Sequence, residues 1–528
     1  NLINGRPNIV LIFADDMGYG DLHSYGHPTQ EYGAIDDLAA EGVRFTQWYS
    51  ADSLCTPSRA ALLTGSLPIR SGMVGPRRVL HVDDAGGLPK NETTIAEALR
   101  EQGYSTGMVG KWHLGNEVEQ NDGRHLPCHH GFDYVGTILP FTFHFLCDPK
   151  RVRSQRFLMK IYNLINFYFL SFIIHLLKYS IPPPNVLCPI ITQSTPQFSL
   201  DKMKTKCFLT RNTSIIQQPI VPETMTQQIV DDVKYYITKN KQGPFFLYMS
   251  LPQLHSAMMC NPQFCNKSKR GIYGDNLNEM AWAVGEVVRL LRQLQIDRNT
   301  LVLFISDNGP ALELCFHGGS SGFLKGGKAT TWDGGIRIPA IAWWPGKIQP
   351  GINTQVLSSM DVFPTLLQLA GGNGRNNGNL DGKSIADLLL GNHDTEIHKI
   401  LFHYCSDRLM AVRFGKYKIH YHTQPLPRYG DNCPDGNPIE DLITGLGCYE
   451  NTTTHKPPLI YNIETDPGET HLLDPSNQQN VLEEVEARIK AHKATIVPVK
   501  SQLGNSREIL KPCCNPPTCV CNYPASVT

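Results

Sequence analysis

The stretch NIVLIFADD, residues 8–16, is a run of mostly apolar residues that ends in two aspartates. A continuous apolar run of this length is typical of a parallel strand whose two faces are both buried. A second run, TLVLFIS at residues 300–306, has the same texture and is followed by Asp307 and Asn308. The two runs therefore predict buried strands of an α/β sheet.

Helical and strand-like patterns alternate on either side of these runs. Helical patterns fall at residues 35–41, 93–103, 228–240 and 278–295, and strand-like segments fall at 43–49, 104–110 and 244–250. Helices that alternate with apolar strands are typical of a sheet covered on both faces. We therefore predict an α/β fold with a large mixed, mostly parallel sheet flanked by helices, in a larger domain that spans residues 1–395.

The texture of the sequence changes after about residue 395. Strand-like segments at 409–415, 417–423 and 458–463 are separated by turns rich in Gly, Pro and Asn, and a helical pattern follows near 480–493. This arrangement predicts a smaller C-terminal α+β domain, residues 396–528, with an antiparallel sheet, a helix and a cysteine-rich tail.

A hydrophobic segment at residues 157–180, within an anomalous insertion at about 151–185, does not fit this pattern. The segment is long enough to cross a bilayer. It contains Lys160 as well as Asn, Ser and His residues, and a lysine at the centre of a membrane helix costs about 2.5–3.5 kcal/mol. Three interpretations stay open: an insertion that packs on the fold or lies at a membrane surface, a transmembrane span, and a segment foreign to the functional protein.

The cysteines and glycosylation sequons indicate a secretory protein. The chain has 15 cysteines, and Asn-X-Ser/Thr sequons occur at Asn91, Asn212, Asn266 and Asn451. Together they favour an oxidising compartment, with disulfides and N-glycosylation. The odd number leaves at least one cysteine outside intramolecular bridges. The chain begins at Asn1 without an apolar leader, so we expect any signal peptide to have been removed.

The last cysteines form a CC-x4-C-x-C cluster. Its members are Cys513, Cys514, Cys519 and Cys521. We expect disulfides here. A zinc site is the alternative, but the neighbouring residues supply no histidine ligand and the expected compartment is oxidising.

The charge balance excludes one class of partner. The 48 basic and 48 acidic residues cancel, so no basic footprint for nucleic acid is present. An anionic substrate would have to be held by a few placed charges.

Oxygen-bearing side chains follow both apolar runs. In open α/β sheets, ligands bind outside the carboxyl ends of the strands. Asp15, Asp16, Asp307 and Asn308 offer oxygen ligands and no thiolate. Such a set suits Ca²⁺ or Mg²⁺, and Ca²⁺ more easily because it accepts an irregular oxygen cage. The alternative for each pair alone is a helix cap or a turn.

Four further residues are candidates for anion binding or proton transfer. Lys111 and His113 follow a predicted strand, and an extended chain would point both to the same side. His255 follows the strand-like segment at 244–250, and Lys328 lies in a glycine-rich stretch. Taken one at a time, each residue is as well explained by a structural role.

Cys55 directly precedes a predicted helix. Pro57 fits the first helical turn, and Thr56 is the expected N-cap. Cys55 would then lie at the positive end of the helix dipole, where Arg59 could grip a tetrahedral oxyanion. A thiolate nucleophile is the simplest chemical interpretation, and a disulfide or a buried thiol stay open beside it.

The motif C-x-P-S-R-x-x-x-L-T-G at residues 55–65 resembles the signature of the sulfatase family. The likeness extends through PNIVLIFADDMGYGD, GKWHLG, FISDNGP and GGKATTWDGG, and into AVRFGKYKIHYHTQ and PPLIYNIETDPGE. It covers nearly the whole chain except residues 148–215. The resemblance implies an alkaline-phosphatase-like fold and a hydrolase for sulfate esters of the aryl sulfate or sulfated glycolipid type.

The resemblance also implies a modified nucleophile. Cys55 would be oxidised to Cα-formylglycine (3-oxoalanine) by a formylglycine-generating enzyme that reads Pro57 and Arg59. One hydroxyl of the hydrated aldehyde would attack sulfur to form a sulfated enzyme. The second hydroxyl would then allow sulfate to be eliminated.

Roles for the other candidates follow from the same resemblance. Asp15, Asp16, Asp307 and Asn308, together with the residue formed from Cys55, would hold a divalent cation, Ca²⁺ or alternatively Mg²⁺. Arg59 and Lys111 would stabilise the oxyanion, and His113 would be the base in elimination. His255 and Lys328 would bind sulfate, with His255 as proton donor to the leaving oxygen.

The sequence departs from the family pattern at the rim of the site. In the stretch LPFTF, Thr142 takes the place of a serine, and SLPQLH leaves His255 as the candidate histidine. The hydrophobic segment at 157–180 interrupts the cysteine-rich region, and it leaves membrane contact open. We further expect a lysosomal or secreted location, with a homodimer left open.

Two rival functions belong to other classes. One is a metal-dependent phosphatase or phosphodiesterase of the same superfold, in which Ser or Thr would be the nucleophile. The other is a catalytically silent protein in which Cys55 stays unmodified.

Overall fold

The structure is a computed structural model, and it describes most of the chain. The described residues are 5–81, 83–116, 118, 122–141, 208–217, 220–256, 258–372, 380–392, 396–426, 447–507 and 510. Thr142, the insertion at 151–185 and the terminal cysteine cluster lie outside the described residues. The predictions made for them therefore stay predictions.

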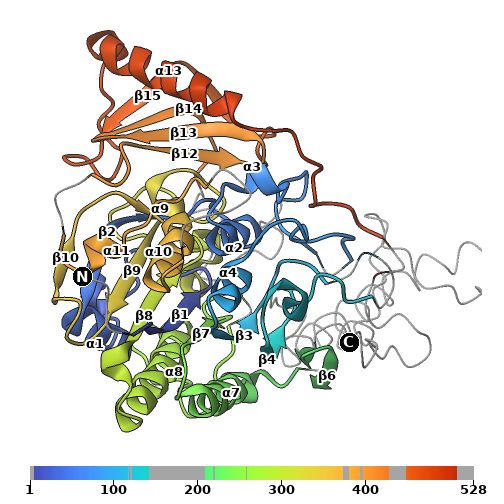
Figure 1. Cartoon of the computed structure of the whole chain (residues 1–528). Helices are drawn as coiled ribbons and strands as arrows, with labels where there is room; N and C mark the ends of the chain where they lie inside the picture. Colours follow the sequence, from blue (N-terminus) through green and yellow to red (C-terminus); the bar gives the residue numbers. More distant parts are fainter. Residues whose placement is uncertain are drawn as a thin grey trace, which may run out of the picture.

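A large mixed sheet forms the centre of the molecule (Figure 1). Its strand order is β10 (Gly351–Asn353), β2 (Val43–Tyr49), β9 (Arg337–Trp343), β8 (Thr300–Ser306), β1 (Asn8–Ala14), β7 (Phe245–Ser250), β3 (Ser105–Lys111), β4 (Tyr134–Leu139), β5 (Leu209–Arg211) and β6 (Ser214–Gln217), and β11 (Leu357–Ser358) pairs with β2. Strands β8, β1, β7, β3 and β4 run parallel, whereas β9 is antiparallel to both of its neighbours. The predicted mixed, mostly parallel sheet is thus confirmed.

Strand β1 lies between β8 and β7, and this place explains its apolar sequence. Ile9, Leu11 and Phe13 pack into one core cluster, while Val10 and Ile12 pack into another. The side chains on both faces of β1 are therefore removed from water, and this burial of apolar surface stabilises the central position of the strand.

Helices cover both faces of the sheet. One face packs against α1 (Ala34–Glu41), α7 (Pro222–Asn240) and α8 (Ile272–Gln293), and the other packs against α2 (Cys55–Thr64), α4 (Ile95–Glu101), α10 (Val362–Leu369) and α11 (Ala386–Leu389). The described chain also contains short helical turns: α3 (Pro68–Ser71), α9 (Asp333–Ile336), η1 (His23–Tyr25), η2 (Pro127–His130), η4 (Asp297–Asn299), η5 (Leu312–His317), η6 (Ser359–Asp361) and η8 (Pro475–Gln478). Helix α4 begins with a capping box between Thr94 and Glu97, as its sequence favours.

A second, smaller sheet lies above the first in Figure 1. It is antiparallel, in the order β12 (Ile400–Cys405), β13 (Arg408–Phe414), β14 (Tyr417–Thr423) and β15 (Thr453–Asn462), and α13 (Gln479–Ala494) covers it. The predicted antiparallel sheet with a helix is confirmed. The domain boundary between residues 395 and 396 stays a prediction.

Disulfides occur as the cysteine content led us to expect. Cys260 pairs with Cys265, Cys405 pairs with Cys448, and Cys315 is also disulfide-bonded. Among the described cysteines, Cys55 and Cys128 are free. Cys55 is therefore not part of a disulfide, and its side chain is buried rather than displayed at the surface.

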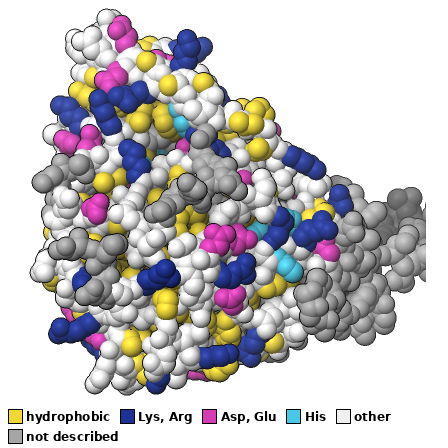
Figure 2. Space-filling model, in the orientation of Figure 1, with side chains coloured by type: hydrophobic (Ala, Val, Ile, Leu, Met, Phe, Trp, Pro, Cys, Tyr) yellow, Lys and Arg dark blue, Asp and Glu magenta, His cyan; other side chains and the backbone are white. Residues whose placement is uncertain are grey.

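The distribution of charge and the hydrophobicity of the helices bear on two of the sequence predictions. Acidic and basic side chains are interspersed over the face shown in Figure 2, in line with the balanced charge. Within the described ranges, we find no helix whose length and hydrophobicity would suit a membrane crossing.

The packing of α13 on the small sheet generates a stability prediction. Ile489 is 6% exposed and belongs to a cluster with Val412, Ile419 and Ile460. We expect Ile489→Ala to lower the free energy of unfolding by about 2–4 kcal/mol, because it removes buried methyl groups and leaves a cavity. Urea denaturation followed by circular dichroism measures this loss.

The matched control is Lys490→Ala on the solvent side of the same helix. Lys490 is exposed, so its truncation should change stability by no more than about 0.5 kcal/mol. Equal effects of the two variants would contradict the described packing of α13.

Candidate active site

The carboxyl ends of three parallel strands of the large sheet bring the predicted polar residues together. Asp15 and Asp16 follow β1, Asp307 and Asn308 follow β8, and Lys111 ends β3. All five side chains are at most 1% exposed. Burying so many charges is costly unless they are paired, so their mutual contacts decide what this edge of the sheet can do.

Helix α2 begins at Cys55 and points its first turn at this edge. The N-cap position is occupied by Leu54, without a side-chain cap. The prediction that Thr56 is the N-cap is therefore wrong. Its hydroxyl instead donates to the carbonyl of His113 at 3.1 Å and accepts from the amide of Leu80 at 3.1 Å. Thr56 thus fastens the helix to the segments that carry His113 and Leu80.

Arg59 connects two of the carboxylates. Its Nη2 donates to Asp15 at 3.1 Å and to Asp307 at 2.7 Å, and its Nη1 donates to the hydroxyl of Ser250 at 2.5 Å. The guanidinium is fully buried. A planar fork suits this bridging role, which a lysine could not reproduce.

Two lysines supply further positive charge. Lys111 Nζ lies 2.6 Å from Asp15 Oδ2, and Lys328 Nζ lies 2.6 Å from Asp16 Oδ2. His255 Nε2 is 3.8 Å from the same oxygen of Asp16. The structure therefore brings both lysines and His255 to the strand ends.

Cys55 lies among the oxygen atoms. Its sulfur is 3.9 Å from Asp16 Oδ1, to which Asn308 Nδ2 donates at 2.8 Å. Two groups of potential ligand atoms lie within 4.8 Å of one another: Asp16, Cys55 and His255, and Asp15, Cys55 and Asp307. The buried Oδ1 of Asn308 has no hydrogen-bond partner in the described part of the chain. Carboxylate and amide oxygens in this arrangement fit a hard divalent cation such as Ca²⁺ or Mg²⁺.

The contacts shift the pKa values of the two paired carboxyls in opposite directions. Burial alone would raise the pKa of Asp15, but Lys111 and Arg59 hold it well below its usual range. For Asp307, burial outweighs Arg59 and raises the pKa to about 7. The two neighbours thus differ in how readily they keep a negative charge, because only Asp15 contacts two cationic side chains directly.

Cys55 is a thiol rather than a thiolate in this setting. Burial raises its pKa well above the usual value, although Lys111 and Lys328 oppose the shift. A simple thiolate nucleophile, one of the interpretations drawn from the sequence, is therefore disfavoured.

His113 is held in one orientation. Strand β3 ends at Lys111, and His113 has a positive φ of 58°, so the two residues do not lie on one extended segment as we had assumed. His113 Nε2 lies 2.9 Å from the carbonyl of Leu80, while its buried Nδ1 has no partner among the described residues. Burial, with Lys111 and Arg59 nearby, holds its pKa well below the usual value. When Nε2 donates its proton to the Leu80 carbonyl, Nδ1 of the neutral ring keeps the lone pair that a proton would need.

His255 is the more exposed histidine of the site. Its side chain is 12% exposed, and its Nδ1 lies 2.6 Å from the carbonyl of Ser256. Burial, with Lys328 nearby, lowers its pKa to about 4.

Sequence reasoning missed several residues that organise this site. Ser250 ends β7 and accepts from Arg59. Asp21, which is fully buried, accepts from the amides of Gly18 at 2.6 Å and Ser320 at 2.7 Å. Asp21 stands in the motif GYGD, and its nearness to the strand end was the signal that could have identified it.

The four sequon asparagines lie away from this buried edge. Asn91, Asn212, Asn266 and Asn451 are all exposed. Their accessibility is compatible with N-glycosylation, which stays a prediction.

Comparison with known proteins adds to this geometry. The sulfatase family model matches residues 7–372, and the model for the C-terminal region of aryl-sulfatase matches residues 396–521. An arylsulfatase of Hemicentrotus pulcherrimus is 41% identical over 98% of this chain and 87% of its own length. Arylsulfatase A of Bos taurus is 39% identical over 89% of this chain and 83% of its own length.

A solved structure agrees with the family match. The crystal structure of the PsFucS1 sulfatase from Pseudoalteromonas sp. superposes with a TM-score of 0.74 at 26% identity, and the match covers 95% of this chain and 92% of that chain. The family models, the full-length relatives and the shared fold lead to one conclusion: the chain belongs to the sulfatase family of sulfuric ester hydrolases.

Proposed function

We propose that the protein hydrolyses sulfate esters through a formylglycine made from Cys55. The observation that carries the proposal is the position of Cys55 at the buried start of α2, 3.9 Å from Asp16 and among the charged side chains of the strand ends.

The modified residue would supply a nucleophile with two hydroxyl groups. In its hydrated form, one hydroxyl forms a bond to sulfur as the ester S–O bond breaks, and loss of the proton from the second hydroxyl then expels sulfate and restores the aldehyde. A serine lacks the second hydroxyl, so its sulfate ester would need a separate hydrolysis.

Arg59, Lys111 and Lys328 would stabilise the charge that develops during this reaction. All three are held within 3.1 Å of a carboxylate, so they are oriented before substrate arrives. Fixed cations that face developing negative charge usually contribute most to catalysis. Lys328 would bind the sulfate together with His255.

The two histidines would move protons in opposite directions. His113, whose neutral ring carries an unpartnered Nδ1, would remove the proton that starts sulfate elimination. His255 would donate a proton to the leaving oxygen. The low pKa of His255 belongs to the enzyme without substrate, and a bound sulfate anion would raise it by charge attraction.

Asp15, Asp16, Asp307 and Asn308 would hold a divalent cation, Ca²⁺ or alternatively Mg²⁺. When bound, the cation would supply Lewis-acid polarisation of the sulfate oxygens. The oxygen-only set and the unpartnered Oδ1 of Asn308 support this assignment. Arg59 and Lys111, which both contact Asp15, would keep that carboxylate ionised and oriented.

The substrate and setting follow from the same proposal. Aryl sulfates and sulfated glycolipids both present the anion that these charges would bind. A formylglycine-generating enzyme would be a partner during maturation, and a lysosomal or secreted location would suit the disulfides and the exposed sequons.

The modification of Cys55 can be tested directly. We expect the tryptic peptide that contains Cys55 to be about 18 Da lighter than the unmodified peptide, because the CH2–SH group of the cysteine becomes an aldehyde group, CHO. Mass spectrometry of protein from a eukaryotic secretory host measures this difference. A peptide that carries only the free thiol, in an enzyme that hydrolyses aryl sulfates, would rule out the proposed nucleophile.

The role of the second hydroxyl predicts the behaviour of Cys55→Ser. This variant should lose turnover by at least about a thousandfold while it keeps its fold, because the serine hydroxyl can be sulfated but cannot expel sulfate. Turnover of p-nitrophenyl sulfate and the circular dichroism spectrum measure the two properties. Ser58→Ala is the control for a hydroxyl in the same turn, since Ser58 donates to the carbonyl of Asp307 at 2.6 Å. Wild-type turnover in Cys55→Ser would contradict the mechanism.

The cation site predicts a binding isotherm that does not depend on activity. After chelation, the protein should bind one Ca²⁺ per chain in calorimetry, with Mg²⁺ weaker, and Asn308→Ala should weaken Ca²⁺ binding at least about tenfold. The control is Asp37→Asn, which removes an exposed acid from α1. Equal affinity in wild type and Asn308→Ala would move the cation away from these residues.

A further inference from the structure

The face of the small sheet that meets the large sheet is charged, although it is buried. His403, Arg413, Lys418 and His420 share this face and are at most 3% exposed. The opposite face is apolar and packs against α13. Buried charges at this contact stabilise the fold less than apolar residues of the same size could. The role of this face therefore has to be inferred from the specific partners of its charged side chains.

Lys418 reaches across to the large sheet's side and pairs with Asp333. Its Nζ lies 2.7 Å from Asp333 Oδ1, and both side chains are fully buried. The other oxygen of Asp333 accepts from the hydroxyl of Tyr49 at 2.9 Å and lies 3.6 Å from Arg337. Burial alone would raise the pKa of Asp333, but Lys418 and Arg337 lower it. Asp333 is therefore an ionised anchor.

Glu469 provides a second connection to the same turn. Its carboxylate accepts from the amide of Asp333 at 2.8 Å and lies 2.6 Å from His420 Nε2. Its backbone carbonyl accepts from Lys325 Nζ at 3.0 Å. The ring of His420 also lies 4.3 Å from that of Trp332, centroid to centroid. Residues 325 and 333 are thus both held from the small sheet's side.

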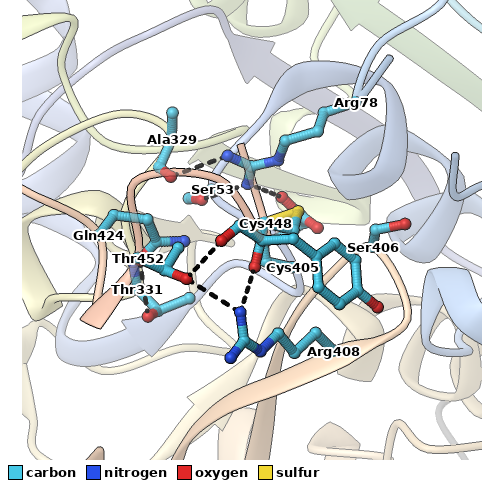
Figure 3. Close-up of a disulfide and its surroundings, with 12 residues drawn as sticks. Ser53, Arg78, Ala329, Thr331, Cys405, Ser406, Arg408, Gln424, Cys448 and Thr452 are labelled. Carbon is cyan, nitrogen blue, oxygen red and sulfur yellow. Dashed lines mark hydrogen bonds and ion pairs between the residues drawn. A yellow bond between two sulfur atoms is a disulfide. The ribbon is translucent and has the colours of Figure 1, made fainter. Parts of the chain in front are cut away.

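A third connection comes from the end of β14. Gln424 accepts from the amide of Thr331 at 3.2 Å and from its hydroxyl at 3.3 Å. Figure 3 shows Gln424 beside Thr331, and it shows Arg78 directed at the carbonyl of Ala329. Arg78 also donates to the hydroxyl of Ser53, two residues before Cys55.

The segment held in this way carries Lys328. Residues 325–335 carry the contacts just described, from Lys325 to Asp333, and Lys328 lies between these two residues with its Nζ 2.6 Å from Asp16. The far end of the segment touches the strand end of β8, because the amide of Gly309 donates to the carbonyl of Gly335 at 2.9 Å. A Cβ on Gly309 would come within 1.9 Å of the Gly334 carbonyl. The segment is therefore in close backbone contact with Gly309, the residue that follows Asn308.

We propose that Asp333, Lys418, His420, Gln424 and Glu469, which we call the Asp333 clamp, are positioning residues for Lys328. The small sheet would thereby set the geometry of the active site, although it contributes no described side chain to the group that surrounds Cys55. The inference rests on the proposed function, in which Lys328 binds the sulfate group. A displacement of about 1 Å at a reacting group can lower a rate by about a hundredfold.

A double-mutant cycle tests the clamp. Lys418→Met removes the charge and keeps most of the volume, and Lys328→Met removes the positioned group. With p-nitrophenyl sulfate, and with rates normalised to formylglycine content, we expect Lys418→Met to lower kcat at least about tenfold. In the Lys328→Met background, the same change should lower kcat by less than about twofold, because the group it positions is absent.

Ile489→Ala is the matched control, since it weakens the small sheet from its apolar face. It should lower the unfolding temperature as Lys418→Met does, yet leave kcat within about twofold of wild type. If Lys418→Met does not fold, Gln424→Ala takes its place in the cycle, because it removes only the two bonds to Thr331.

The outcomes separate the two proposals. Equal loss of kcat from Lys418→Met in both backgrounds, or an equal loss in Ile489→Ala, would overturn the clamp and leave the role of Lys328 intact. Full activity in Lys328→Met would instead overturn the sulfate-binding role of Lys328 itself.

Discussion

The active site depends on the bridge that Arg59 makes between Asp15 and Asp307. Those two carboxylates end neighbouring strands, and at close range in a buried site they would repel each other and push the strand ends apart. The guanidinium of Arg59, whose Nη2 donates to both carboxylates, offsets that repulsion. Lys111 and Lys328 continue the same pattern of alternating sign around Cys55. The site is thus a compact set of opposite charges in which each group is stable because its neighbours are present.

The two sheets bury their faces for different purposes. In the large sheet, both faces of β1 are apolar and simply remove surface from water. In the small sheet, the face under α13 is apolar. The opposite face carries buried ion pairs, which add less stability but make fixed, directional contacts. Charged contacts of this kind specify one relative placement, whereas apolar surfaces tolerate small shifts.

Much of this architecture could be predicted from local sequence. Asp15 and Asp307 could be placed because each directly follows an apolar run, and the carboxyl ends of parallel strands meet at one edge. Strand β9 was not identified, because its sequence RIPAIAW contains Pro339, and a proline within a short apolar run argues against a strand. The role of Thr56 was misjudged, since its partner His113 is distant in sequence. Long-range charge pairs such as Lys418 with Asp333 leave no local pattern at all, and only the folded arrangement brings them to view.

Helix α2 has a consequence for the order of events in the life of the chain. All ten of its residues are buried, from Cys55 to Thr64. No enzyme could bind Cys55 together with Pro57 and Arg59 once α2 is packed against the sheet. If Cys55 is modified as we propose, the reaction must take place on the nascent, still extended polypeptide. The folding rate would then compete with the modification, and a chain that folds first would keep its thiol permanently.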